Sequence, residues 1–244
     1  MNTQVIILAA GHGKRMQSEL PKALTPFRGK PFITRMLDAV KESGVCEHPI
    51  IVIGQKGDQV RSVVGDSYTY AIQEEQLGTG HAVMIAEHEA KDATSILVLY
   101  SDHPLMSAQT IKNIVIKHAE ENATLTMATA TVPDFLEWRA GLQLFGRLVR
   151  DANNNIIKIV EYKDATETEK EILEVNPAYM CFDAHWMWEH LHMLKNNNAQ
   201  GEYYLTDLVG MAFNEHKKIT TISIDPKEAL GVNTKEQLDL MQEL

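Results

Sequence analysis

Short apolar runs alternate with amphipathic segments along the first half of the chain. Runs rich in β-branched residues predict buried strands at residues 5–10, 49–53, 70–72 and 96–100. Apolar residues at helical spacing predict helices at residues 32–43, 57–64 and 80–90. Strands that are apolar on both faces and separated by helices indicate an α/β fold, with a mostly parallel sheet covered by helices on both sides.

The pattern changes after a predicted strand at residues 124–131. Residues 146–151 and 156–161 are joined by an Asn-rich turn, which predicts a hairpin instead of another β-α unit. This change indicates a smaller, β-rich lobe. A strand at residues 219–224 and a helix at residues 235–244 follow it.

Composition is typical of a globular enzyme. The 244 residues, 44% of them hydrophobic, can bury a large core as one domain with an appended lobe. No apolar run approaches the ~20 residues that cross a bilayer, and residues 5–10 are too short for a signal peptide, so we expect a cytoplasmic protein without membrane contacts. The net charge of -10 gives no nucleic-acid footprint. The two cysteines, Cys46 and Cys181, are expected to be buried thiols.

The first predicted strand ends in a glycine-rich, cationic loop. Gly11 and Gly13 allow the backbone N–H groups to approach a ligand, and Lys14, Arg15 and Lys22 add positive charge in an acidic chain. This pattern suits a polyphosphate, although Gly-rich turns after a first strand are also common in α/β proteins without such a ligand. A dinucleotide-binding fingerprint would require a third glycine at position 16, where this chain has Met16. A P-loop would require a Gly-Lys-Ser/Thr sequence, which does not follow here, so the spacing excludes both motifs.

Two later strand exits also carry polar residues. Gly78 and Gly80 open a helix whose amides could meet an anion or a base edge, or Thr79 could simply cap that helix. Asp102 follows the strand at residues 96–100 and could bind Mg²⁺ or cap the helix that begins near Ser107. The histidines at residues 185–194 lack the spacing of a helical zinc site, so that segment is expected to be a core-facing helix.

The first loop closely resembles the signature of a known family. The sequence Leu8-Ala9-Ala10-Gly11-x-Gly13-x-Arg15-Met16, followed by Pro21-Lys22-x-Leu24, is similar to that of the sugar-phosphate nucleotidyltransferases. The resemblance spans nearly the whole chain and implies a single domain of Rossmann-like fold. It divides that domain into a nucleotide-binding part at about residues 1–132, a sugar-binding lobe at about 133–226, and a closing metal-ligand loop and helix at about 227–244.

The resemblance also implies the nucleotide site. Residues 73–82, Gln-x-x-Gln-Leu-Gly-Thr-x-His-Ala, resemble the uracil-binding stretch of the family's uridylyltransferases, and the amide of Gln73 offers a donor and an acceptor to a pyrimidine. The implied catalytic residues are Arg15, Lys22 and Asp102. The implied nucleotide-binding residues are Leu8, Ala10, Gly11, Gly13, Gln73, Gly78 and Thr79.

The later motifs resemble the N-acetylglucosamine-1-phosphate uridylyltransferases. They imply that the sugar is bound by Gly146, Glu161, Asn176, Glu202, Tyr204 and Thr206. In this family a Gly-Val-Asn asparagine joins the motif aspartate on Mg²⁺, which makes Asp102 and Asn233 the expected metal pair, although Asn233 could instead cap the last helix.

Three features depart from the family pattern. Ser101 replaces a glycine, and Asn176-Pro177-Ala178 replaces the usual Asn-Thr-Gly beside the sugar. Bifunctional members continue into a left-handed β-helix with acetyltransferase activity, and nothing here resembles its hexapeptide repeats.

The expected activity is Mg²⁺-dependent transfer of a uridylyl group. UTP and N-acetylglucosamine 1-phosphate would give UDP-N-acetylglucosamine, a cell-wall precursor, and pyrophosphate. The alternatives are a pyrophosphorylase for another hexose 1-phosphate, a cytidylyltransferase for isoprenoid or lipid precursors, and a non-catalytic sugar-nucleotide sensor. The sequence leaves open the natural sugar, the oligomeric state and whether the chain is complete.

Overall fold

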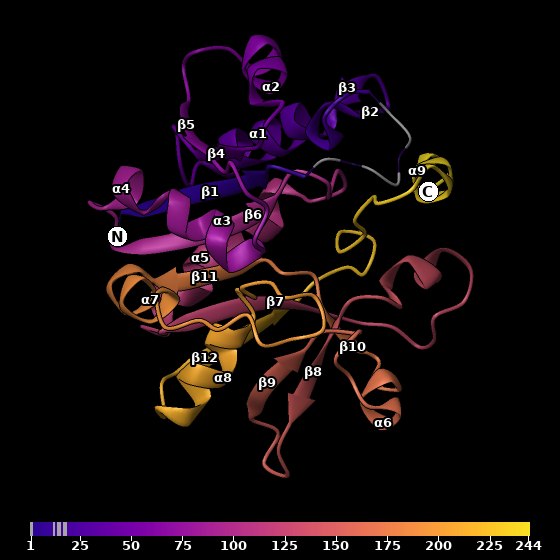
Figure 1. Ribbon diagram of the computed structural model, residues 1–244. Coiled ribbons are helices and arrows are strands. Elements are labelled where there is room, and N and C mark those ends of the chain that lie inside the picture. Colours follow the sequence, from indigo (N-terminus) through magenta and orange to yellow (C-terminus); the bar gives the residue numbers. More distant parts are fainter. Residues whose placement is uncertain (1, 12, 14–15, 17–18) are drawn as a thin grey trace.

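The computed structural model describes residues 2–11, 13, 16 and 19–244, and within them a ten-stranded mixed sheet runs through the molecule (Figure 1). Its strands are β1 (Thr3–Ala9), β4 (Ile50–Ile53), β5 (Thr69–Ile72), β6 (Ser95–Tyr100), β7 (Leu125–Thr131), β8 (Gly146–Arg150), β9 (Ile156–Val160), β10 (Glu174–Asn176), β11 (Met180–Asp183) and β12 (Ile219–Ser223). The short strands β2 (Pro26–Phe27) and β3 (Lys30–Pro31) form a separate pair.

The sheet order is β5-β4-β1-β6-β11-β7-β10-β8-β9, and β12 also pairs with β7. The strands β5, β4, β1 and β6 are parallel, which confirms the predicted α/β fold with a mostly parallel core. Between β6 and β7 lies β11, antiparallel to both, although it comes much later in the chain and was not predicted. The sequence range expected to form the sugar-binding lobe therefore also supplies strands to the main sheet.

The helices cover both faces of this sheet. They are α1 (Phe32–Ser43), α2 (Gly57–Val64), α3 (Thr79–Ile85), α4 (Glu87–Ala90), α5 (Ala108–Glu120), α6 (Glu167–Lys170), α7 (Ala184–Leu191), α8 (Asp207–Asn214) and α9 (Lys235–Gln242), with 3-10 turns η2 (Lys22–Leu24) and η3 (Glu137–Leu142). Alternate residues of β1 point to opposite sides. Val5 and Ile7 join a core with α1 and α5, whereas Ile6 and Leu8 join a core with α3, α7 and α8. Both faces of the central strand are thus removed from water.

The helix predicted at residues 80–90 is two helices, so that prediction was wrong. The N–H of Ala86 bonds to Val83 O at 3.0 Å and forms a tight turn between α3 and α4. The turn keeps Ala86 and Ala90 buried in the core, which helical spacing alone did not reveal. The predicted bounds of α1 and α2 are confirmed, and Gly44 ends α1 in the left-handed conformation.

The helix α7 is core-facing, as predicted. Trp186, Met187 and Leu191 are buried, while His190 lies between Trp186 O and a carboxylate oxygen of Glu215. Both cysteines are free, Cys181 in the core and Cys46 half-buried. Across the described residues, every helix is too short or too polar to cross a bilayer.

Candidate active site

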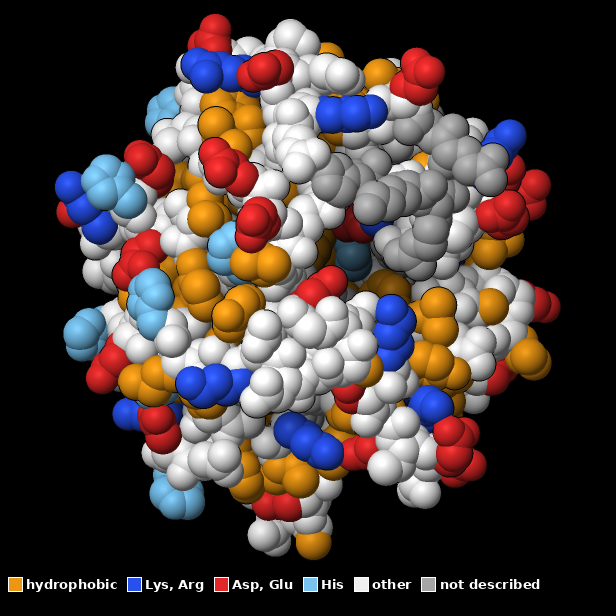
Figure 2. Space-filling view, viewed as in Figure 1, with side chains coloured by type: hydrophobic (Ala, Val, Ile, Leu, Met, Phe, Trp, Pro, Cys, Tyr) orange, Lys and Arg blue, Asp and Glu red, His pale blue; other side chains and the backbone are white. Residues whose placement is uncertain are grey.

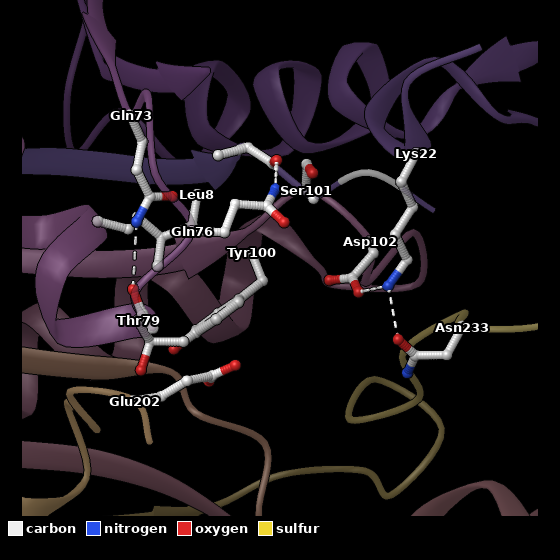
Figure 3. Close-up of a pocket in the computed structure, with 14 residues that line it drawn as sticks. Leu8, Lys22, Gln73, Gln76, Thr79, Tyr100, Ser101, Asp102, Glu202 and Asn233 are labelled. Carbon is white, nitrogen blue, oxygen red and sulfur yellow. Dashed lines mark hydrogen bonds and ion pairs between the residues drawn. The ribbon is translucent and has the colours of Figure 1, made fainter. Parts of the chain in front are cut away.

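The carboxyl ends of β1, β5 and β6 meet at one edge of the sheet and enclose a cavity of about 370 Å³, here called the strand-exit cavity. Figure 3 shows side chains from segments far apart in the chain pointing into it. The described residues lining this cavity are Leu8, Ala10, Gly11, Lys22, Gln73, Gln76, Gly78, Thr79, Ala82, Tyr100, Ser101, Asp102, Glu202 and Asn233.

A second cavity of about 220 Å³ adjoins the first, beside the β8–β9 hairpin, and is called the hairpin cavity. Its described lining is Tyr100, Asp102, His103, Gly141, Leu144, Phe145, Gly146, Glu161, Asn176, Pro177, Ala178, Asn233 and Gln237. Tyr100, Asp102 and Asn233 line both cavities, so these residues form the boundary between them. Figure 2 shows this side of the molecule hollowed near its centre.

A polar cluster lies at that shared boundary. The Lys22 ammonium donates to a carboxylate oxygen of Asp102 and, over 2.7 Å, to Asn233 Oδ1 (Figure 3). Burial alone would raise the pKa of Asp102, but the Lys22 charge and its hydrogen bond hold that pKa below the ordinary value. Asp102 is therefore an anion at neutral pH, paired with the Lys22 ammonium.

Neither expected ligand is consumed in capping a helix. Ser107 caps α5 by accepting from the Thr110 N–H, and Thr234 caps α9 through a capping box with Gln237. The side chains of Asp102 and Asn233 instead turn toward Lys22.

A carboxylate and an amide oxygen converging on one point, beside cavities open to water, fit the oxygen ligands and partial hydration that Mg²⁺ prefers. The described residues contain no cluster of three or more His, Cys, Asp or Glu arranged for a metal, so substrate oxygens would have to complete such a site.

Two motif stretches far apart in sequence are joined by their backbones. The N–H of Gly80 donates to Tyr203 O, and the N–H of Tyr203 donates to Leu77 O, both over 2.8 Å. Thr79 does not cap α3, since its hydroxyl accepts from the Leu205 N–H at 3.1 Å. The start of α3 is therefore fixed against residues 203–205, and this contact places Glu202 beside Gly78 and Thr79 in the lining of the strand-exit cavity.

Gly78 is required for this contact. Its φ is +107°, and a Cβ atom built there would lie 2.6 Å from Tyr203 O and 2.8 Å from Tyr203 N. We expect Gly78→Ala to lower the free energy of unfolding by about 3 kcal/mol, because it adds left-handed strain and a collision with backbone. In thermal unfolding, that loss corresponds to a fall in Tm of roughly 6–12 °C.

Gly201→Ala is the matched control. Gly201 has a φ of +66° but nothing within 4 Å of a built Cβ, so the substitution adds backbone strain without a collision. We expect it to cost only about 1 kcal/mol. Equal losses in the two variants would show that the contact with Tyr203 does not constrain position 78.

At the far end of the strand-exit cavity, glutamine side chains lie against the backbone. Gln73 is only 3% exposed, at the end of β5. The Gln76 amide donates to Ala10 O and so connects this stretch to the first loop. Gln76 belongs to the motif that suggested base recognition, but no separate role was predicted for it.

The hairpin cavity brings together Gly146, Glu161 and Asn176, three of the residues predicted to bind the sugar. Burial raises the pKa of Glu161, and the neighbouring Asp207, Asp164 and Glu202 charges raise it further, while the Thr206 hydroxyl donates to it at 2.9 Å. A Cβ atom at Gly146 would lie 2.9 Å from the side chain of Ile159, which explains the glycine. Glu161 is a half-buried carboxyl group at the cavity wall that accepts a hydrogen bond from Thr206.

The departure at residues 176–178 places a residue other than glycine in a left-handed backbone conformation beside this cavity. Ala178 has a φ of +67°, a left-handed conformation that costs about 1 kcal/mol for a residue other than glycine. Asn176 Oδ1 accepts from the Ala178 N–H at 2.9 Å and holds this turn. The ring of Pro177 and the methyl group of Ala178 consequently form part of the cavity wall. Ser101, the other departure, does not have a positive φ and so is unstrained.

Some of the predicted residues lie elsewhere. Arg15 lies outside the described residues, while Gly13, Tyr204 and Thr206 line neither cavity. The Tyr204 hydroxyl accepts from Gln200 Nε2 at 2.9 Å, and Thr206 acts through Glu161. Glu202, expected at the sugar, lines the strand-exit cavity instead of the hairpin cavity.

Sequence reasoning missed Tyr100 and His103, which flank the Asp102 motif. Burial raises the pKa of Tyr100 beyond its ordinary range, so its hydroxyl stays protonated. His103 Nδ1 lies 2.5 Å from the Tyr179 hydroxyl, which donates to Glu228 O at 2.7 Å, and burial lowers the pKa of His103 to about 4. Their position at a strand exit was a usable signal, because side chains there face the ligand edge of the sheet.

Comparison with known proteins agrees with this geometry. Residues 5–199 match the MobA-like NTP transferase domain. The chain is 42% identical over 236 residues to the bifunctional protein GlmU of Brevibacillus brevis and 43% identical over 235 residues to that of Fervidobacterium nodosum. Each alignment covers 96% of this chain and 49% of the relative, so the chain spans about half the length of these relatives.

Solved structures show the same fold. A UDP-glucose pyrophosphorylase complexed with UDP-glucose superposes with a TM-score of 0.80 at 17% identity, covering 100% of this chain and 98% of the other. A putative glucose-1-phosphate thymidylyltransferase from Bacillus anthracis gives 0.75 at 20% identity, covering 99% and 96%. The matched domain and the shared fold confirm the resemblance seen in the sequence, and the chain belongs to the MobA-like NTP transferase family.

Proposed function

We propose that this chain is a Mg²⁺-dependent uridylyltransferase that converts UTP and N-acetylglucosamine 1-phosphate into UDP-N-acetylglucosamine and pyrophosphate. The observation that carries the proposal is the pair of adjoining cavities that share Asp102 and Asn233. A nucleotide in the strand-exit cavity and a sugar in the hairpin cavity would place their phosphates at this shared boundary. The relatives named GlmU and the neighbour that holds UDP-glucose support a sugar nucleotide as product.

The reaction needs little acid or base catalysis. A sugar 1-phosphate has a second pKa of about 6, so at neutral pH its oxygen is already an anionic nucleophile. That oxygen would attack the α-phosphorus of UTP in line with the leaving pyrophosphate. Positioning and charge neutralisation are therefore the main tasks of the protein.

The described residues suit these tasks. Lys22 would neutralise charge that develops on the α-phosphate, and the Gly11 backbone would approach the phosphates of UTP. Asp102 and Asn233 would hold Mg²⁺, which when bound neutralises phosphate charge and aligns the two substrates. Arg15 is proposed to assist the departure of pyrophosphate. Glu161 and Asn176 are proposed to form hydrogen bonds with the sugar. A cytoplasmic location stays an expectation from the sequence.

A second candidate is a uridylyltransferase for another hexose 1-phosphate, because Pro177 and Ala178 change the wall of the hairpin cavity. Pyrophosphate release should be measured with UTP, Mg²⁺ and a panel of sugar 1-phosphates. We expect N-acetylglucosamine 1-phosphate to give a kcat/KM at least about tenfold above glucose 1-phosphate, since an unmatched polar group costs ~1–3 kcal/mol. A reversed order favours the second candidate, and no release with any sugar favours a non-catalytic sensor.

A further inference from the structure

Within the part of the chain that the structure describes, the amide of Gln73 is held by contacts to its nitrogen. Its Nε2 lies 3.3 Å from Gly78 O and 3.1 Å from His81 Nδ1. A carbonyl oxygen only accepts hydrogen bonds, so the contact with Gly78 identifies the amide atom facing it as nitrogen. The two N–H groups of this nitrogen are thus matched by two acceptors.

This arrangement leaves the amide oxygen for a ligand. Figure 3 shows the Gln73 nitrogen directed toward the start of α3 and its oxygen on the cavity side. Gln73 is 3% exposed, so few other orientations are open to it. The side chain therefore presents an acceptor, and not a donor, to whatever occupies this end of the cavity.

His81 is the side chain that completes this orientation. It lies on α3, and its Nδ1 must be unprotonated to accept from Gln73, which places the proton on Nε2. Without that acceptor one amide N–H would be buried and unsatisfied, and the amide would gain by turning toward the cavity. Of the two acceptors that now face the Gln73 nitrogen, only Gly78 O, at 3.3 Å, would remain.

We propose that His81 is a positioning residue for base selection: it fixes the Gln73 amide so that only a base with an N–H at the facing position is accepted. Uracil carries a donor at N3, whereas cytosine carries an acceptor there and would face the Gln73 oxygen with a second lone pair. The proposal rests on the proposed use of UTP and assigns a role to a residue that need not touch the nucleotide.

The test compares His81→Leu, which has no acceptor, with His81→Asn, whose amide oxygen can take the place of Nδ1. Kd values for UTP and CTP should be measured by calorimetry with the whole chain and Mg²⁺, together with kcat/KM for both nucleotides. We expect His81→Leu to lower the UTP-to-CTP ratio about 3- to 10-fold, the range for one neutral hydrogen bond, and His81→Asn to restore most of it. The KM for the sugar phosphate should change less than twofold.

Two controls separate positioning from a general structural effect. His88→Leu alters an exposed histidine on α4 and should leave the ratio unchanged. In a Gln73→Ala background the ratio should already be low, and adding His81→Leu should not lower it further, because His81 acts through Gln73. If His81→Leu proves too unstable to measure, the comparison of His81→Asn with Gln73→Ala still decides the matter.

The proposal is overturned if His81→Leu keeps the parent UTP-to-CTP ratio, if His81→Asn lowers that ratio as much as Gln73→Ala does, or if the parent chain binds UTP no better than CTP. Failure of the proposed activity looks different. In that case no sugar 1-phosphate would support pyrophosphate release, while the calorimetric preference for UTP and its loss in His81→Leu would persist.

Discussion

Asp102→Asn is expected to lower kcat about 10³-fold while leaving the fold intact. The substitution keeps the shape of the side chain but removes the anion at the boundary of the two cavities, where the proposed Mg²⁺ ion would bind. Its side chain is 18% exposed and adjoins open cavities, so water can solvate Lys22 in the variant. Pyrophosphate release across a Mg²⁺ titration measures the effect, and Tm should fall by only a few degrees.

Asp38→Asn is the matched control for the loss of a carboxylate. Asp38 pairs with Lys30 at the surface, 2.6 Å apart, and both side chains are more than half exposed. Its loss should change kcat less than twofold, because exposed ion pairs contribute little. Near-normal turnover of Asp102→Asn at ordinary Mg²⁺ concentrations would remove Asp102 from the metal site.

Lys22→Ala is expected to lower kcat/KM about 10²-fold. Lys22 is 13% exposed and is the one lysine among the described residues that line the two cavities, so its charge can meet the phosphate charge that develops during transfer. Its present partners, Asp102 and Asn233, are the proposed metal ligands. Removing the ammonium should therefore leave the Mg²⁺ concentration for half-maximal activity unchanged or lower, in contrast to Asp102→Asn.

Lys56→Ala controls for the loss of a nearby cation. Lys56 is exposed and donates to Glu19 O at 2.6 Å, outside both cavities. We expect its removal to change kcat/KM less than twofold. A change of only a few-fold in Lys22→Ala would mean that Lys22 is a bystander, and a raised Mg²⁺ requirement would mean that it helps to organise the metal site instead.

The pattern of the sequence predicted the central fold because that fold depends on local periodicity. The continuous apolar run of β1 predicted a strand that is buried on both faces. The spacing of apolar residues such as Met36 and Val40 predicted a helix with one buried side. The same reasoning failed for β11, whose apolar residues, Met180 to Phe182, are too few to separate a strand from the start of a helix.

The candidate site was predicted in part for a related reason. Gln73 and Asp102 follow strands, and the ends of parallel strands meet at one edge, so topology brings them together. The contact of Tyr179 with His103 had no sequence signal, since it depends on a backbone path that the neighbouring residues do not fix.

The sequence by itself thus determined the alternating strands and helices of the central fold and which strand exits carry polar chemistry, because spacings of two and 3.6 residues are local properties. Only the tertiary structure decided where β11 inserts, that Gly78 lies against Tyr203, and that Lys22 reaches Asp102, 80 residues away, and Asn233, 211 residues away. Contacts at such separations depend on how the helices and strands pack together, and packing is a property of the whole chain.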